Sequence, residues 1–297
     1  MHSCGRSFRN PAKPDPATLR ASRRRLDRPY SVVYRERALI PVLFQIGPLT
    51  VYSFGVLMAL GFYLGSLVTV QEFRRRGGDG DHMWNLLVWV FVAGLVGSRL
   101  LSVANDPAAF FANPLEELAS GSGFVWYGGL VGGFLVAIPL RRAYQMRFTT
   151  LLDCTALGLA LGQAIGRLGC HVAGDGDWGV PTELPWGVAY TNAIVGWNEA
   201  PGVTVHPTPI YEALAYGSVY GVLNALRKRS LPPGSLFCVY LVGTSAARFA
   251  VEFIRINPTV LFGLSQAQLV ALVLFSVGCA WLLRNLLASA PVSEGAG

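Results

Sequence analysis

The run LLDCTALGLALGQAIGRLGCHV, residues 151–172, decides the fold class because it is long enough to cross a bilayer as a helix. A transmembrane helix needs about 20 predominantly apolar residues. Other apolar segments of similar character occur at about 49–70, 83–104, 125–140, 208–226, 234–254 and 264–283. The sequence therefore predicts an all-α, polytopic membrane helix bundle of about seven transmembrane helices. The third segment is short and rich in glycine, so it could be tilted, broken or partly re-entrant.

The composition supports this fold class and narrows the possible partners. The chain is 52% hydrophobic and 14% charged, whereas about a quarter of the residues in a typical soluble domain are charged. Its formal net charge of +7 resides in residues 1–37, so it does not indicate nucleic-acid binding. The five cysteines are widely spaced and lack the spacing typical of metal sites, so we expect neither a metal nor a cofactor.

The chain divides into three parts by composition. Residues 1–37 are rich in proline and arginine and predict a disordered basic tail. This tail is either a cytosolic anchor for anionic lipid or the product of a start codon placed too early. Residues 38–286 form the expected transmembrane catalytic domain, and residues 287–297 a short C-terminal tail. The run ALIPVLFQIG, residues 38–47, is a candidate for an outer arm along the membrane interface.

Loop charges predict the orientation. Basic stretches follow the first, third, fifth and seventh apolar segments, whereas 102–124 and 172–207 contain acidic residues and no lysine or arginine. By the positive-inside rule, the C-terminus is cytoplasmic and 172–207 is an extracytoplasmic head, either an interfacial cap or a substrate-docking element. Seven spans would place the N-terminus outside. The positive-inside rule would instead place the basic N-terminal tail in the cytoplasm, so the two predictions disagree.

Ionisable residues within the predicted spans indicate a functional site, because charge in a membrane is costly. The arginines outnumber the carboxylates, so some positive charge is expected to lack a protein partner. Guanidinium groups suit phosphate, which predicts a pocket for an anionic lipid headgroup. The alternatives are a structural Arg248–Glu252 ion pair and an Arg99 that reaches toward the interface. The residues concerned are Arg99, Asp153, Arg167, His171, Glu212, Arg248 and Glu252, with Arg255 at the end of the sixth segment.

Glycines in FVWYGGLVGGF, residues 124–134, have two interpretations. Small residues let helices approach closely. Gly128 and Gly129 could equally let a lipid headgroup approach backbone N–H groups.

Six motifs together resemble the prolipoprotein diacylglyceryl transferase family, in the family's order, from about residue 44 to 284. VGSRL resembles its GxR element and VWYGGLVGG its HGGLxG element. The stretch IGRLGC…GDGDWG resembles its signature GRxGN…G…G. The motifs FQIGPLTVYSFGVL, HPTPIYEAL and ARFAVEFIR resemble IGP…YG, HPxQLYE and RFxxEFxR.

The resemblance implies an enzyme of the bacterial inner membrane. It would transfer the sn-1,2-diacylglyceryl group of phosphatidylglycerol to the lipobox cysteine thiol of a preprolipoprotein, forming a thioether and releasing glycerol-1-phosphate. The implied partners are phosphatidylglycerol, preprolipoprotein signal peptides and the membrane. The candidate catalytic residues are Arg167, Arg248 and Glu252, which match the family motifs, together with Tyr127 and His171. Implied substrate-binding residues are Arg167, Arg99, Gly128, Gly129, Glu212 and Arg248.

Several positions depart from the family pattern. Tyr127 replaces the family's histidine, Cys170 its asparagine, and Phe54 and Thr244 two of its tyrosines, while the glycine–acid stretch is one residue longer. A tyrosine with a pKa near 10 is a poor base, so His171 is a candidate to replace the family's histidine as the proton acceptor. The alternative role for His171 is a hydrogen bond at the membrane edge. A divergent member that binds phospholipid with altered substrate or lost transfer activity is the alternative function.

Overall fold

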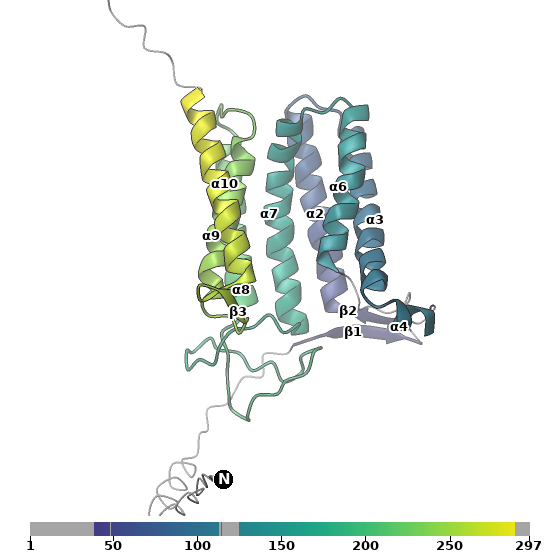
Figure 1. The fold of residues 1–297 in the computed structure, drawn as a ribbon, viewed down its shortest axis with the longest axis vertical. Coiled ribbons are helices and arrows are strands. Elements are labelled where there is room, and N and C mark those ends of the chain that lie inside the picture. Colours follow the sequence, from purple (N-terminus) through teal and green to yellow (C-terminus); the bar gives the residue numbers. More distant parts are fainter. Residues whose placement is uncertain (1–38, 48, 113, 115–124, 289–297) are drawn as a thin grey trace, which may run out of the picture. The chain divides into compact units, whose positions relative to one another are not determined.

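The computed structural model describes residues 39–47, 49–112, 114 and 125–288, so the predicted N-terminal tail, with Cys4, and residues 289–297 lie outside the described part. Seven long helices coincide with the seven apolar segments (Figure 1). They are α2 (Ser53–Arg75), α3 (Gly80–Asn105), α6 (Trp126–Ala143), α7 (Phe148–Ala173), α8 (Thr208–Leu226), α9 (Ser235–Glu252) and α10 (Gln266–Ala288).

Among the described helices, α2, α3, α7, α9 and α10 are long and apolar enough to cross a membrane. The predicted all-α polytopic membrane fold is therefore confirmed. The third apolar segment forms α6, an unbroken helix of 18 residues that contains Pro139.

Glycines allow two of the helix pairs to pack at very short range. Helix α2 lies along α7, and α3 lies along α6. A Cβ atom added to Gly65 would lie 2.6 Å from the carbonyl oxygen of Gly158, and one added to Gly97 would lie 2.4 Å from that of Gly128. No larger residue fits these positions without moving a helix, so the glycines fix both pairings.

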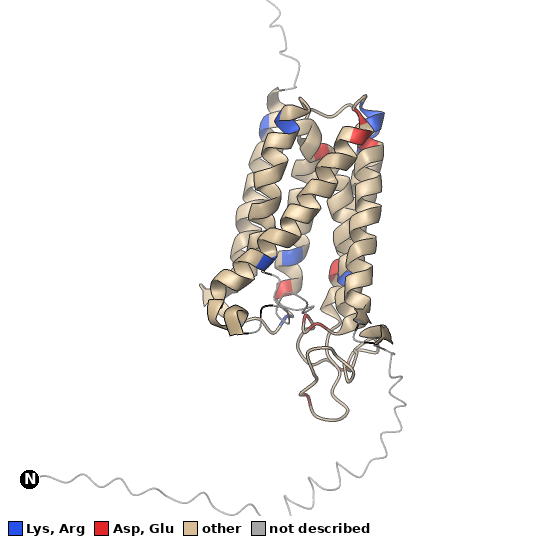
Figure 2. Cartoon of the chain, turned by 90° about the vertical axis from the view of Figure 1, so that its right-hand side faces the viewer, with Lys and Arg blue, Asp and Glu red and all other residues tan. Residues whose placement is uncertain are grey.

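The two ends of the bundle differ in their connections. The basic connections α2–α3, α6–α7 and α8–α9 and the end of α10 lie together at one end, called here the basic end (Figures 1 and 2). Residues 174–207 extend from the opposite end, called here the loop end (Figure 1). This arrangement matches the alternation of basic and acidic loops along the chain.

Short elements gather at the loop end. Strand β1 (Val42–Ile46) pairs antiparallel with β2 (Leu49–Tyr52), and β3 (Thr259–Leu261) pairs with β4 (Leu264–Ser265). Helix α4 (Pro107–Ala112) follows α3 directly. Every residue of β1 is exposed although most are apolar, so the predicted interfacial arm is the first strand of this hairpin. Its contact with a membrane remains a prediction.

The head, residues 174–207, has a small core of its own. Tyr190 is fully buried and stacks on Trp178 with ring centroids 4.9 Å apart. Val188 and Val205 pair through backbone hydrogen bonds beside them. These contacts give the head a packed interior despite its few regular elements.

A closed ionic cluster lies at the basic end, consisting of Glu72, Arg75, Arg76, Asp153 and Arg227. Glu72 is fully buried and accepts hydrogen bonds from Arg75 at 2.6 and 2.8 Å and from Arg76 at 2.8 Å. Asp153 accepts from Arg76 at 3.2 Å and from the backbone N–H groups of Gly234 and Phe237 at the start of α9. Each carboxylate oxygen of this basic-end cluster therefore has a hydrogen-bond donor.

Candidate functional site

The end of α7 places the signature arginine beside an acidic turn. Helix α7 ends at Gly174, which adopts a left-handed φ of 64°. A Cβ atom there would lie 2.8 Å from Ala193, so glycine suits the position on both counts. The chain then turns back, and the Asp177 carboxylate contacts the guanidinium of Arg167.

Glu212, near the start of α8, is the centre of the site. Its side chain is fully buried and accepts a 2.6 Å hydrogen bond from Arg248 Nη1. Its other oxygen lies 3.1 Å from Arg167 Nε and 3.6 Å from Arg255 Nη1. One carboxylate therefore joins arginines from α7, from α9 and from the segment that follows α9.

Glu252, at the end of α9, holds the other side of the same arginines. Its Oε2 lies 3.1 Å from Arg248 Nη2 and 3.5 Å from Arg255 Nε. Its Oε1 accepts 2.7 Å hydrogen bonds from Asn257 and Ser265. Glu252 thereby fixes Arg248 and Arg255 to the β3–β4 region.

Asp177 closes the group from the head. Its two oxygens contact Arg167 and Arg255, and its backbone carbonyl accepts a hydrogen bond from Thr208 at the start of α8. Burial alone would raise the pKa of Asp177, but the hydrogen bonds and charges of Arg255 and Arg167 outweigh it and hold that pKa below its usual value.

The six residues form a balanced network, called here the loop-end cluster: Arg167, Asp177, Glu212, Arg248, Glu252 and Arg255. For the three arginines of this cluster, the predicted lack of a protein partner is wrong, because each of them has carboxylate partners. The expectation counted only residues within the spans and so left out Asp177, which approaches from the head.

Although balanced, the loop-end cluster is not saturated with hydrogen bonds. Within the described part of the chain, Oε2 of Glu212, Oε2 of Glu252, and Nε and Nη1 of Arg255 have ionic neighbours but no aligned hydrogen-bond partner. Arg167 and Arg248 keep 23% and 22% of their side chains exposed, whereas Arg255 keeps 5%. Arg167 and Arg248, both predicted from the sequence as site residues, are therefore the more accessible arginines of the cluster.

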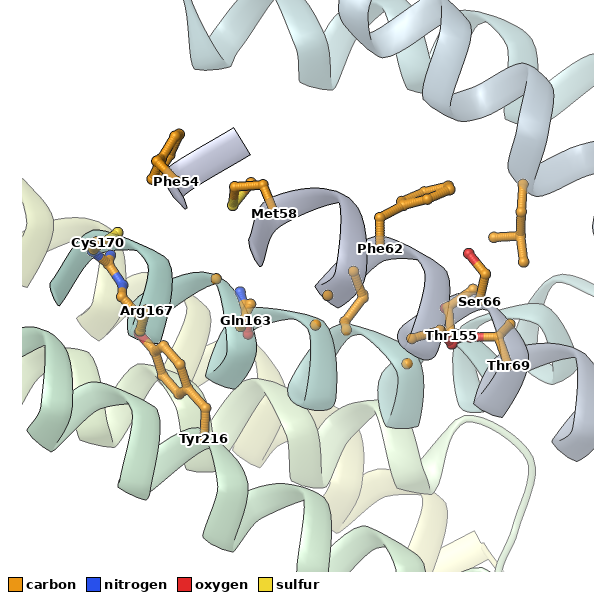
Figure 3. A pocket seen from close by; sticks show the side chains of 17 residues that line it. Phe54, Met58, Phe62, Ser66, Thr69, Thr155, Gln163, Arg167, Cys170 and Tyr216 are labelled. Atoms are coloured by element: carbon orange, nitrogen blue, oxygen red, sulfur yellow. Dashed lines mark hydrogen bonds between the residues drawn. The ribbon is translucent and has the colours of Figure 1, made fainter. Parts of the chain in front are cut away.

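A cavity of about 480 Å³ opens beside Arg167. It runs along the seam between α2 and α7, with Arg167 and Cys170 at one end (Figure 3). Gln163 lies between the two ends, and Phe54, at the position of a family tyrosine, lies on the α2 side. The site thus combines a guanidinium with an elongated, mostly apolar space, an arrangement suited to an amphiphilic anion.

The other residues predicted for the site are placed differently. Gly128 is buried, and a Cβ atom there would lie 2.3 Å from the carbonyl oxygen of Gly97. Gly129 likewise faces Gly94 of α3. Their helix-packing interpretation is therefore supported. Tyr127 is 55% exposed, and its hydroxyl accepts a 3.3 Å hydrogen bond from Gln266 at the start of α10.

His171 lies one turn beyond Arg167 and contacts the head. Its Nδ1 lies 2.8 Å from the hydroxyl of Tyr190, whose ring meets the imidazole edge to face. This position favours the structural alternative for His171. Arg99, on α3, is partly buried and does not belong to the loop-end cluster described here.

Sequence reasoning missed Asp177 and gave Arg255 no role. The quoted stretch GDGDWG contains Asp177, but only the fold of the head shows that it faces the arginines. Ligand atoms of Cys170, Asp175 and Asp177 lie within 4.8 Å of one another. Because two arginines already engage Asp177, this grouping does not by itself indicate a metal site.

Comparison with known proteins adds independent evidence. The family model described as prolipoprotein diacylglyceryl transferase matches residues 41–284. The chain is also similar to proteins named phosphatidylglycerol–prolipoprotein diacylglyceryl transferase. One, from Clostridium tetani, is 31% identical over 73% of this chain and 86% of its own length. The relative from Clostridioides difficile is 30% identical over 78% of this chain, and the one from Dehalococcoides mccartyi is 33% identical over 80% of this chain. Each alignment covers 90% of the relative's own length.

Proposed function

The chain belongs to the prolipoprotein diacylglyceryl transferase family, and from that premise we propose that it moves the diacylglyceryl group of phosphatidylglycerol onto the lipobox cysteine of preprolipoproteins. The thiolate sulfur attacks the glyceryl carbon that carries the phosphate ester. The carbon–oxygen bond breaks, glycerol-1-phosphate leaves and a thioether forms. The nucleophile belongs to the substrate, so the enzyme itself supplies binding, charge stabilisation and a path for the thiol proton.

The observation that carries this proposal is the position of Arg167. Its guanidinium is held by two carboxylates, remains 23% exposed, and lies at the end of a cavity large enough for part of a lipid. Ion pairs with Glu212 and Asp177 fix its orientation before substrate arrives, which is what preorganised stabilisation of a leaving phosphate requires. Arg248, oriented by Glu212 and Glu252, is the second accessible guanidinium.

The remaining residues have supporting roles in this proposal. Glu212 and Glu252 orient the arginines, and Tyr127 is placed to donate a hydrogen bond at the loop end. His171 is the candidate to receive the thiol proton, because a neutral phenol such as that of Tyr127 is a poor base. The contact of His171 with Tyr190 argues that it mainly positions the head.

The protein is a multi-pass membrane protein, and we propose its orientation from the loop charges. The basic end would lie in the cytoplasm with the C-terminus, and the head outside the bacterial inner membrane. This places the loop-end cluster at the outer leaflet, where an exported signal peptide would meet it. Residues 38–286 then form the transmembrane catalytic domain. Its head was predicted at 172–207 and begins at residue 174 in the structure, because α7 continues to Ala173.

The test is a mass-shift assay with purified protein, phosphatidylglycerol vesicles and a lipobox peptide. Wild type should add one diacylglyceryl group to the peptide cysteine, whereas Arg167→Ala should not. Arg74→Ala, an exposed arginine at the basic end, is the matched control and should behave as wild type. A wild-type protein that binds phosphatidylglycerol but leaves the peptide unmodified would favour the divergent lipid-binding alternative.

A further inference from the structure

The cavity beside Arg167 has the form of a groove with two distinct ends. Its floor is lined by glycines of the α2–α7 seam, whose backbones pack closely against the facing helix. Phe54, Met58 and Phe62 of α2 lie in a row along one wall (Figure 3). Arg167 marks one end, and Ser66, Thr69 and Thr155 mark the other. We refer to this space as the seam groove.

The length of the seam groove matches the depth of one membrane leaflet. Twelve residues of α7 separate Thr155 from Arg167, which corresponds to about 18 Å at 1.5 Å per residue. The hydrocarbon core of a bilayer is about 30 Å thick, so one leaflet is about 15 Å deep. A chain that starts at Arg167 and fills the groove would therefore end near the middle of the membrane.

Two of the three hydroxyl groups at the far end of the groove already donate within their own helices. Thr69 donates its hydroxyl to the carbonyl of Gly65 at 2.9 Å, and Thr155 donates its hydroxyl to the carbonyl of Leu151 at 3.0 Å. Both hydroxyls are used within their own helices. Ser66 is 3% exposed and Thr69 is 2% exposed, so buried side chains border this end of the groove.

We propose that the seam groove holds one acyl chain of the anionic lipid substrate and that Ser66, Thr69 and Thr155 set the longest chain that fits. This inference rests on the proposed function and adds a chain-length limit to it. The occupant is identified by its chemistry: an anionic head at the Arg167 guanidinium joined to an unbranched apolar chain along the glycine floor. The charge of Arg167 at one end and the apolar, elongated shape of the rest of the seam groove therefore both suit an anionic lipid.

A plug at the far end tests the limit. Ser66→Phe should lower the transfer rate from phosphatidylglycerol with 18-carbon chains about tenfold relative to 14-carbon chains, in vesicles of otherwise equal composition. A tenfold change is about 1.4 kcal/mol, the value of about two buried methylene groups. Ser66→Leu, with a smaller side chain, should produce a smaller change in the same ratio and serves if the phenylalanine variant does not fold.

The matched control is Ser276→Phe on α10, whose serine is exposed and bonds within its own helix as Thr69 does. It should keep the wild-type chain-length ratio. An unchanged ratio in both Ser66 variants would overturn the inference while leaving the proposed function intact, provided that they still transfer. A raised KM for the peptide with an unchanged lipid ratio would also overturn it and assign the groove to the signal peptide. Failure of wild type with every chain length would instead contradict the proposed function.

Discussion

The two ionic clusters of this protein use the same residue types for different purposes. In the basic-end cluster, every oxygen of Glu72 and Asp153 accepts a hydrogen bond. In the loop-end cluster, one oxygen each of Glu212 and Glu252 has only misaligned ionic contacts, and a cavity opens beside Arg167. The closed arrangement indicates a structural joint between helices, whereas a partly exposed guanidinium at the end of an elongated, mostly apolar cavity indicates a place for an amphiphilic anion.

The comparison predicts its largest effect at Arg167. Arg167→Ala should lower diacylglyceryl transfer by at least about 10²-fold, the range observed when one donor to a developing oxyanion is removed. Transfer to a lipobox peptide, followed by mass spectrometry, measures this loss. Arg167→Lys should recover little, because an ammonium cannot hold Glu212 and a phosphate with the same planar geometry.

The matching change at the basic end should affect stability instead. Arg76→Ala removes hydrogen bonds to Glu72 and Asp153 and should reduce the free energy of unfolding by about 2 kcal/mol. Thermal unfolding in detergent measures this change. The transfer rate per folded molecule should equal that of wild type. A loss of transfer rate as large as that of Arg167→Ala would show that the basic-end cluster also contributes to transfer, against the comparison.

A third prediction separates the role of Tyr127, a hydrogen-bond donor, from that of His171, the candidate proton acceptor. Tyr127→Phe removes one hydroxyl and should lower transfer about tenfold, the effect of one hydrogen bond worth about 1.4 kcal/mol. His171→Gln should leave the pH profile of transfer in place and lower the unfolding temperature, because it weakens the contact with Tyr190. Loss of the acidic limb of the pH profile, the fall in rate toward low pH, in His171→Gln would make the imidazole the acceptor.

The smallest expected effect concerns acid. The pKa of Asp177 is held below its usual value, so its contribution to stability is complete above the unfolded value of about 3.9. That contribution is lost as the pH falls through the lower, folded value. Burial raises the pKa of the neighbouring Asp175, so Asp175 titrates at a higher pH than Asp177. Fluorescence of the head tryptophans should therefore show a separate change in strong acid that belongs to Asp177. Asp177→Asn should lack this strong-acid transition, and its persistence in the variant would contradict the assignment.

The sequence predicted the fold better than it predicted the site. Apolar runs such as 151–172 determined the helices because membrane helices must satisfy their own backbone. Arg167, Glu212, Arg248 and Glu252 were recognised because charge within such runs is costly. Asp177 was missed because it lies in the head, whose course depends on packing around Tyr190 and Trp178 rather than on any sequence period.

Glycine illustrates the same limit. The repeats near Gly128 predicted either close helix packing or access for a ligand, and both expectations were reasonable from sequence. The structure uses Gly128 for packing against Gly97, while the seam between α2 and α7 both packs closely and borders a cavity. Whether a glycine contacts another helix or borders a cavity depends on the neighbouring side chains, which the sequence pattern does not place.

The central claim is that the loop-end cluster binds a phospholipid phosphate while the basic-end cluster does not, and lipid binding tests it most directly. Purified wild type, Arg167→Gln and Arg76→Gln would be titrated with phosphatidylglycerol or zwitterionic phosphatidylcholine, with bound lipid counted by native mass spectrometry. We predict that wild type and Arg76→Gln retain phosphatidylglycerol in preference to phosphatidylcholine and that Arg167→Gln loses this preference. Equal retention of phosphatidylglycerol by Arg167→Gln and wild type would contradict the account.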